Sequence, residues 1–387
     1  GCLEALRAFD DIRIRLFGRE EEIRPYLSGE EYDAARLEIL DARDVITNDE
    51  APMFAVRHKT DSSLVRAAMD VRAGNSGALI SAGSTGAVLA CGMLRIGRIA
   101  GVDRPALAAI LPNMSGVPDM LLDAGANVDC RPEYLLRFAQ MGDIYARQVL
   151  GIQNPRVGLL NIGEEEEKGC QLTKATYALL KKAKLNFTGN VEARGVLNGG
   201  ADVIVCDGYH GNLVIKASEG AISAIFKMLR RELNATFISK LGAALSHPAF
   251  RRVKRRMDVN EVGGGPLLGV RGAVVKPHGN STGHAFFCCL RQARQMLAGN
   301  VVEIIEQLEQ IEGGNENVTA LIAEQLKIDP KTIKPESRLL EDLRADSANI
   351  MMLIMDVESE LGIVVDDDAL MRMKTVGDVV KYLESKQ

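Results

Sequence analysis

Residues 201–208 read ADVIVCDG, a short apolar run that is rich in β-branched side chains and ends in Asp and Gly. Such a run is typical of a strand that is buried on both faces of a parallel sheet. Comparable runs alternate with helical patterns between residues 33 and 300, and they read ALISAG (78–83), ALAAIL (106–111), MLLDAG (120–125), RVGLLNIG (156–163) and NFTGNV (186–191). The pattern predicts an α/β fold with helices on both faces of a parallel sheet.

Gly, Asn and Asp residues stand at the ends of these runs. In open parallel sheets the ligand site lies outside the carboxyl ends of the strands. We therefore expect the runs to end at one crevice and to surround it with their polar end residues.

The bulk composition predicts a globular protein with more than one folding unit. Its 387 residues exceed the roughly 250–300 at which single cores stop growing. Hydrophobic residues make up 47% and charged residues 26%, which argues against a disordered, fibrous or membrane-embedded chain. An uninterrupted apolar run of about 18 residues is absent and the first residues are amphipathic, so we expect a cytoplasmic protein that is neither exported nor membrane-spanning. No CxxC pair occurs, and we expect no metal site.

The charge is distributed unevenly along the chain. Residues 313–387 hold 15 acidic and 9 basic side chains, a net charge of −6, whereas the whole chain carries −5. Gly313 and Gly314 begin a polar link at the start of this acidic segment. The sequence therefore predicts two domains, residues 1–312 and residues 313–387.

Ser347 follows Asp346 at the start of an acidic amphipathic helix in the second domain. Taken locally, this serine is a helix N-cap, for which Ser is a favoured residue type. Over residues 315–386, however, LLEDLRADS (339–347), the acidic helix and VDDDALMRMKTVGDVVKYLE (365–384) resemble an acyl carrier protein. The resemblance implies a small four-helix carrier domain with 4′-phosphopantetheine attached to Ser347.

Two positions depart from the carrier pattern, since Arg344 and Ala348 replace a common glycine and the usual leucine. The resemblance also implies that the acidic helix, with Asp356, Glu358 and Glu360, meets basic patches on partner enzymes. An ordinary solvated helix face explains these charges equally well.

The turn SAGSTGA (81–87) links a predicted strand to a predicted helix. Such turns expose backbone N–H groups at a helix N-terminus, where an anion is favoured, and we predict that this anion is phosphate. Neither GxGxxG after the first strand nor GxxxxGK[ST] occurs in the sequence, so no nucleotide is expected.

A series of motifs follows in order, namely SAGSTGA, LLDAGANVD (121–129), PRVGLLNIGEEEEKG (155–169), NFTGNVE (186–192), ADVIVCDGYHGNLVIKASEG (201–220), GGGPLLGVRG (263–272) and HGNS (278–281). From residue 1 to about residue 300 the series resembles the acyl-carrier-protein:phosphate acyltransferase (PlsX) family. The resemblance implies an α/β/α sandwich of the isocitrate/isopropylmalate dehydrogenase-like type, and a homodimer.

The implied reaction transfers a fatty acyl group from an acyl carrier protein thioester, on the chain's own carrier domain or a free one, to inorganic phosphate. The acyl phosphate would serve phospholipid synthesis through a downstream membrane glycerol-3-phosphate acyltransferase. No nucleic acid partner is implied. Phosphate is already an oxyanion, so the enzyme needs to position it and to stabilise developing charge rather than to supply a nucleophile triad.

The predicted phosphate site comprises Gly83, Ser84, Thr85 and Gly86, with Lys168 as a cation near the transferred group. The matched motifs contribute further candidate catalytic residues, namely Asn161, Asn190, Asp207, His210 and Asn212. Each has a structural alternative: Lys168 as a solvated charge, Asp207 as a turn cap, and His210 and His278 as structural histidines.

Residues 220–257 have helical periodicity, and we expect Pro248 to divide the helix. Its second part joins an apolar stripe to five basic residues, Arg251, Arg252, Lys254, Arg255 and Arg256. Basic residues beside an apolar helix face favour peripheral attachment to an anionic membrane, here its inner surface. A dimer interface and a docking site for the acidic carrier helix are the alternatives.

The chain departs from the family pattern at its start, where the family has a β-strand with an Asp-Ala-Met-Gly-Gly-Asp motif and this sequence begins in the following helix. We therefore expect that strand and part of the site to be absent. This favours an alternative function, a catalytically inactive scaffold that presents its tethered carrier. A dehydrogenase of related fold is the second alternative, against which the absent dinucleotide motif weighs.

Overall fold

The computed structural model describes residues 1–113, 117–257, 261–279 and 281–312, together with residues 337, 338, 342, 374, 375 and 378. The chain forms two compact units, one of Gly1–Gly97 with Arg104–Ile305 and one of Arg98–Asp103 with Glu306–Gln387. Ser347 and the predicted four-helix carrier fold lie outside the described residues. The fold that follows is that of the first unit.

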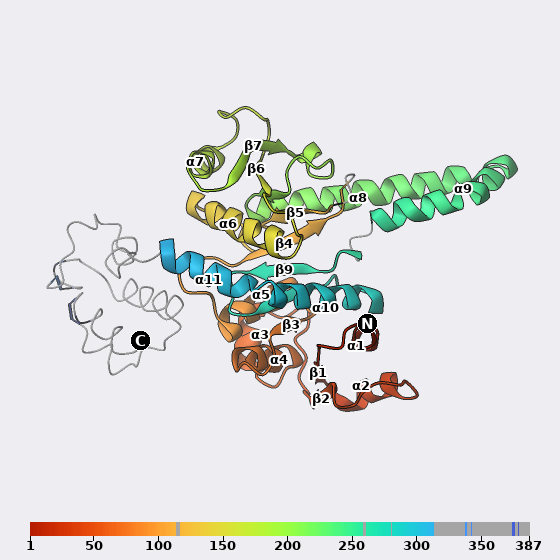
Figure 1. Ribbon diagram of the computed structural model, residues 1–387, viewed down its shortest axis with the longest axis horizontal. Coiled ribbons are helices and arrows are strands. Elements are labelled where there is room, and N and C mark those ends of the chain that lie inside the picture. Colours follow the sequence, from red (N-terminus) through yellow and green to blue (C-terminus); the bar gives the residue numbers. More distant parts are fainter. Residues whose placement is uncertain are drawn as a thin grey trace. The chain divides into compact units, whose positions relative to one another are not determined.

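An eight-stranded sheet forms the centre of the first unit (Figure 1). Its strands lie in the order β3 (Ala78–Ile80), β10 (Ala273–Lys276), β9 (Gly265–Leu268), β4 (Ala106–Leu111), β5 (Asp119–Leu122), β8 (Val203–Val205), β6 (Arg156–Asn161) and β7 (Asn186–Glu192). The runs that the sequence identified as strands are all present, and the prediction of an α/β fold is confirmed.

The prediction of a parallel sheet is wrong, because β9 is antiparallel to β10 and to β4, and β4 is antiparallel to β5. The physical reason is the length of two connections. Residues 112–118 join β4 to β5, and residues 269–272 join β9 to β10. A parallel connection requires a crossover of about a dozen residues or more, so these short links permit only antiparallel neighbours.

The expected convergence of all strand ends on one crevice is wrong for the same reason. Strands β3, β10 and β4 share one direction, whereas β5, β8, β6 and β7 run in the other. Their carboxyl ends therefore lie at opposite edges of the sheet. We call the edge at which β3, β10 and β4 end the turn edge, and the edge at which β5, β6, β7 and β8 end the amide edge.

Helices cover both faces of the sheet. On one face lie α4 (Ser63–Arg72), α5 (Thr85–Cys91), the π-helical segment η1 (Gly92–Ile96) and the start of α8 (Gly208–Leu233), and they share two clusters of buried apolar side chains with the strands. On the other face lie α6 (Pro132–Gln148) and α10 (Gly283–Ala298). The closeness of α6 requires Gly142, where a Cβ would lie 2.6 Å from Val203 Cγ1.

A buried polar bridge joins the two helices of the second face. The Gln292 side-chain amide donates to Tyr145 Oη at 2.7 Å and to the Gly264 carbonyl at 3.0 Å. The Gly264 N–H in turn donates to Gln292 Oε1 at 2.8 Å. The amide thus links α10, α6 and the chain before β9.

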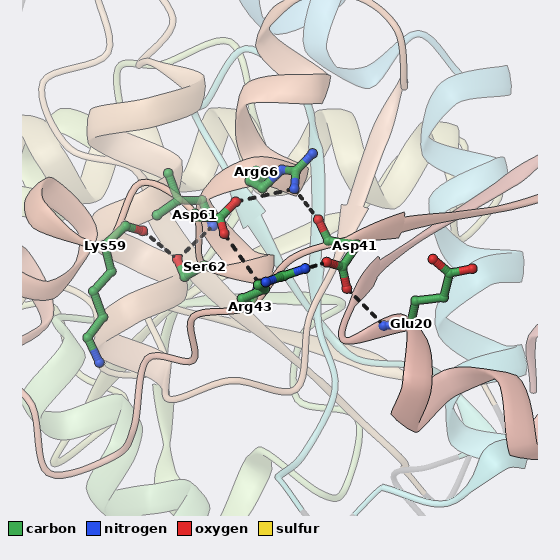
Figure 2. Close-up of polar contacts among 8 residues, drawn as sticks. Glu20, Asp41, Arg43, Lys59, Asp61, Ser62 and Arg66 are labelled. Carbon is green, nitrogen blue, oxygen red and sulfur yellow. Dashed lines mark hydrogen bonds and ion pairs between the residues drawn. The ribbon is translucent and has the colours of Figure 1, made fainter.

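A second, two-stranded parallel sheet pairs β1 (Ile14–Gly18) with β2 (Leu37–Asp41), and the helices α1 (Cys2–Ala8) and α2 (Glu20–Leu27) belong to the same region, whereas α3 (Pro52–His58) packs with α4 and α5 beside the central sheet. Figure 2 shows the polar contacts at the end of β2. Asp41 accepts from the Glu20 N–H at 3.0 Å and from Arg43 Nε at 3.1 Å, while Arg66 of α4 pairs with Asp61 at 3.2 Å and also donates to the Asp41 carbonyl. These contacts fasten β2 to α2 and α4.

A cavity of about 940 Å³ lies between the two sheets, and residues of β1, β3 and α10 line it. Within the described residues, β1 pairs only with β2 and β3 pairs only with β10, so each strand has one unpaired edge. Ser81 belongs to the lining, which brings the cavity to the turn that follows β3.

Two long helices, α8 and α9 (Phe237–Arg256), extend together away from the sheet (Figure 1). The predicted break at Pro248 is wrong, since α9 continues through this proline and the helices separate at residues 234–236. Thr236 caps α9 by accepting from the Ser239 N–H at 3.0 Å, which favours a start at that point. Phe237, Ile238 and Leu245 are each about 80% exposed. No helix in the described part of the chain is long and apolar enough to cross a membrane.

The remaining elements are α7 (Gln171–Leu180), the 3₁₀ turn η2 (Ala193–Gly195) and α11 (Val301–Glu312).

Candidate functional site

The predicted phosphate turn lies at the turn edge, between β3 and α5. The Gly83 N–H donates to Ser81 Oγ at 3.2 Å, and Ser84 is the N-cap of α5, accepting from the Ala87 N–H at 3.2 Å. Gly86 packs against Pro52, and a Cβ there would lie 2.7 Å from Pro52 Cγ, so only glycine fits. Thr85 is exposed. The turn has the predicted form, and its binding of phosphate stays a prediction.

Lys276, at the end of β10, is a neighbour of this turn that the sequence analysis missed. The Ser81 N–H donates to the Val275 carbonyl at 3.3 Å, so the turn begins beside the last residue of β10. Lys276 is partly buried, and its Nζ donates to the Pro277 carbonyl at 3.0 Å. Burial and the charge of Lys216 lower the pKa of Lys276. In the sequence the signal was a lysine at the end of the apolar run Ala273–Val275.

Lys216, whose charge acts on Lys276, belongs to a charged cluster with Glu219 and His278. Lys216 and Glu219 lie one turn apart on α8 and pair at 3.2 Å. His278 Nε2 lies 3.4 Å from Glu219 Oε1. Glu219 thus contacts both Lys216 and His278.

Asn161, Asn190 and Lys168 lie together at the amide edge. Asn161 donates to the Lys168 carbonyl at 3.1 Å, and Asn190 donates to the Glu165 carbonyl at 2.7 Å. Asn190 is only 7% exposed, whereas the Lys168 side chain is exposed among the glutamates of the loop. Both amides hold the loop between β6 and α7. The structure brings these three residues together but does not bring them to the phosphate turn.

Asp207, His210 and Asn212 lie where β8 passes into α8, also at the amide edge. Asp207 is buried and caps α8 by accepting from the His210 N–H at 2.9 Å, and its second oxygen lies 2.6 Å from His210 Nδ1. The His210 side chain is 60% exposed, so its other nitrogen can reach solvent or a ligand. Asn212 packs on Gly125, whose φ of +120° and close approach suit glycine alone.

Asp123, directly after β5, is a second residue that the sequence analysis did not single out. It is fully buried and accepts from the backbone N–H groups of Leu107, Ala126 and Asn127 at 3.0, 3.2 and 2.6 Å. Burial raises the pKa of Asp123 to about 6 despite these donors. The carboxylate links β4 to the loop after β5. In the sequence it is recognisable as an acidic residue directly after the apolar residues Met120–Leu122.

The other predicted positions are the basic residues of α9. Arg251, Arg252, Arg255 and Arg256 lie with Lys254 in the last turns of this helix, and Arg255 pairs with Glu261 at 3.7 Å, four residues before β9. No cluster of three or more metal-ligating side chains occurs among the residues that the structure describes.

Comparison with known protein families gives two matches. The family model described as "fatty acid synthesis protein" matches residues 1–304, and the one described as "phosphopantetheine attachment site" matches residues 316–383. Together with the fold, these matches define the class: an α/β acyltransferase of lipid synthesis joined to a phosphopantetheine attachment domain.

The chain belongs to the fatty acid synthesis protein family, and its curated relatives are phosphate acyltransferases. The protein of Geobacillus thermodenitrificans is 49% identical over 306 residues, which cover 79% of this chain and 92% of the relative. That of Bacillus pumilus is 47% identical over 317 residues, covering 82% and 94%, and that of Clostridium perfringens strain ATCC 13124 is 49% identical over 303 residues, covering 78% and 89%.

Two solved structures are similar at low sequence identity. A phosphotransacetylase from Streptococcus pyogenes has 14% identity, covers 74% of this chain and 85% of its own, and gives a TM-score of 0.46. A branched-chain phosphotransacylase from Enterococcus faecalis V583 has 15% identity, covers 76% and 92%, and gives a TM-score of 0.45.

Proposed function

We propose that the chain transfers a fatty acyl group from an acyl carrier protein thioester to inorganic phosphate and so supplies acyl phosphate for phospholipid synthesis. One observation carries the proposal: a domain 49% identical to phosphate acyltransferases and a phosphopantetheine attachment domain occur in the same chain. An enzyme that consumes carrier thioesters and a carrier that presents them are thus covalently joined.

The transfer needs few protein groups. A phosphate oxygen attacks the thioester carbonyl carbon, the carbon–sulfur bond breaks, and the thiolate that leaves takes up a proton from water. The protein has to bind phosphate beside the carbonyl and to stabilise the charge on the carbonyl oxygen. In this proposal Gly83, Ser84, Thr85 and Gly86 hold phosphate at the turn edge, whereas Asp207 and His210 lie at the amide edge and are given no step in the transfer.

The donor thioester is attached to 4′-phosphopantetheine on Ser347, which supplies the thiol that carries the acyl group. Ser347 lies within the matched segment 316–383, and Asp346 precedes it as in carrier proteins. We expect the chain's own carrier and a free acyl carrier protein both to serve as donors, and no metal or nucleotide to take part.

Several finer features complete the proposal. The first unit has the α/β/α sandwich of the isocitrate/isopropylmalate dehydrogenase-like type, residues 313–387 form a four-helix carrier domain, and the enzyme acts in the cytoplasm as a homodimer. The exposed apolar side chains of α8, among them Ile225 and Met228, offer a surface for the second copy.

Peripheral contact with the inner face of the membrane is proposed for α9. Phe237, Ile238 and Leu245 are exposed on the helix that also carries Arg251, Arg252, Lys254, Arg255 and Arg256. The product is an activated lipid that a membrane glycerol-3-phosphate acyltransferase would consume, so release at the bilayer shortens its path through water. Each basic residue near an anionic surface contributes about 1 kcal/mol.

Vesicle flotation tests the membrane proposal. Binding should require anionic lipid, weaken with salt, and fall when the five basic residues are changed to Gln. Loss of carrier turnover in that variant, with flotation unchanged, would instead assign the basic residues to carrier docking.

The proposed reaction is tested with a separately prepared, acylated free carrier. Incubation with the enzyme and phosphate should release the carrier thiol and form an equal amount of acyl phosphate. The Ser347→Ala variant should retain this activity, because the free carrier replaces the missing arm. Thiol release that does not depend on phosphate, or an enzyme that leaves the carrier acylated, would contradict the proposal and favour the scaffold.

A further inference from the structure

We propose that Lys276 binds the phosphate substrate and holds it at the Ser81–Gly86 turn, an inference that rests on the proposed function and names a residue for its phosphate site. Lys276 takes the role that the sequence analysis gave to Lys168. Lys168 is exposed at the amide edge, whereas Lys276 is partly buried at the turn edge.

The strand register places Lys276 next to the turn. Strands β3 and β10 are parallel with Leu79 opposite Val274 and Ile80 opposite Val275, and the Ser81 N–H donates to the Val275 carbonyl, so the same register continued by one residue brings Ser81 beside Lys276. Side chains alternate between the faces of a sheet, so Ser81 and Lys276 lie on the same face as Leu79 and Val274. Those two apolar residues belong to the cluster shared with α4 and α5. Lys276 therefore lies on the face where the turn leads into α5.

The local charge is positive. Lys276 and Lys216 are close enough for Lys216 to depress the pKa of Lys276, and the nearby carboxylate is Glu219. Glu219 pairs with Lys216 and approaches His278, while within the described residues the contact recorded for Lys276 Nζ is a single carbonyl, that of Pro277. An ammonium group has three donors, so two remain for an anion.

A bound phosphate would relieve the repulsion between the two lysines. Phosphate near neutral pH carries one to two negative charges and offers several acceptors, which suits a site with two ammonium groups beside backbone N–H donors. The competing interpretation is that Lys276 only fixes the chain at Pro277. Such a lysine would affect folding and leave the concentration dependence on phosphate unchanged.

The activity test compares Lys276→Met, Lys276→Arg and, as control, Lys182→Met, since Lys182 is an exposed lysine after α7. With acylated free carrier as donor, Lys276→Met should lower kcat/KM for phosphate by about 100-fold, the usual loss for a preorganised charge-stabilising donor. Much of this loss should be a higher KM for phosphate, Lys276→Arg should recover part of it, and Lys182→Met should match wild type.

A binding test separates this inference from the proposed reaction. Inorganic phosphate should raise the Tm of the wild-type full chain in a concentration-dependent way, because a ligand that binds only the folded state stabilises it. In Lys276→Met the same phosphate series should raise the Tm far less, each variant being compared with its own phosphate-free value. A wild type that phosphate does not stabilise, or a folded Lys276→Met with unchanged stabilisation and KM, would overturn the role of Lys276. If phosphate stabilises wild type through Lys276 but no thiol is released, the proposed reaction fails and the phosphate site stands.

Discussion

The two edges of the central sheet both carry polar side chains directly after or at the end of strands, but these side chains differ in how many hydrogen bonds they make within the chain. At the amide edge, the polar side chains bond largely to their own chain: Asn161 and Asn190 donate to backbone carbonyls, and Asp207 caps α8 and contacts His210, although Asn190 Oδ1 is buried without a partner among the described residues. At the turn edge, Lys276 Nζ donates to one carbonyl within the described residues, and the charge of Lys216 acts on it. A polar residue after a buried strand therefore indicates a ligand site only when its bonding capacity is not already used within the chain.

The largest effect is expected from Asp119, the first residue of β5. Asp123 directly follows the same strand, so the two buried carboxylates lie at its two ends and can be compared. Asp119 is 1% exposed, and burial together with the charge of Asp202 raises its pKa to about 7, although Asn113 donates to it at 2.6 Å. A rise from the ordinary 3.8 to about 7 corresponds to roughly 4 kcal/mol. Because the folded state holds this proton more tightly than the unfolded state, stability falls as pH rises from about 4 to about 7.

Asp119→Asn should therefore raise the free energy of unfolding at pH 8 and flatten its dependence on pH between 4 and 7. Denaturant titrations at pH 5, 6, 7 and 8 measure both quantities. The matched Asp123→Asn should destabilise the protein instead, since Asp123 accepts from three backbone donors. If the free energy of unfolding of Asp119→Asn depends on pH as steeply as that of wild type, Asp119 is not the group that causes the pH dependence.

A smaller effect is expected from Asn190→Ala. The change removes the hydrogen bond from Asn190 to the carbonyl of the exposed Glu165, and such a bond contributes about 0.5–1.5 kcal/mol. If Asn190 only fixes the loop between β6 and α7, the free energy of unfolding should fall while KM for phosphate stays within twofold of wild type. Chemical denaturation and a phosphate titration of the same preparation test this. A large rise in KM with unchanged stability would place Asn190 in the phosphate site and break the contrast between the edges.

The smallest effects concern the two helix caps, one at each edge. Ser84→Ala and Asp207→Ala each remove an N-cap, a change that typically costs about 1 kcal/mol. The two variants should lose similar stability, but only Ser84→Ala should weaken the stabilisation by phosphate, because its cap orders the turn beside Lys276. Thermal unfolding of both variants with and without phosphate measures this difference. If phosphate raises the Tm of both variants equally, the proposed difference between the two edges is wrong.

Short-range signals in the sequence predicted the α/β class, the positions of β3 to β8 and the turn after β3, since apolar runs and glycine-rich turns depend on neighbouring residues. The prediction of strand direction was wrong, although the short link from Leu111 to Asp119 already excluded a parallel pair. The site was predicted least well. Whether Asn190 faces a ligand or the Glu165 carbonyl depends on contacts across 25 residues, and the nearness of Lys276 to Ser81 depends on pairing between strands distant in sequence.

The most direct test of the proposed transfer is intact-mass spectrometry of the acylated holo-protein. Without phosphate, the acyl group should remain on the phosphopantetheine arm attached to Ser347. After phosphate is added, the protein should lose the acyl mass and an equal amount of acyl phosphate should appear. Acyl loss without phosphate, an acyl group on a residue other than Ser347, or a thioester that persists in phosphate would contradict direct transfer from carrier to phosphate.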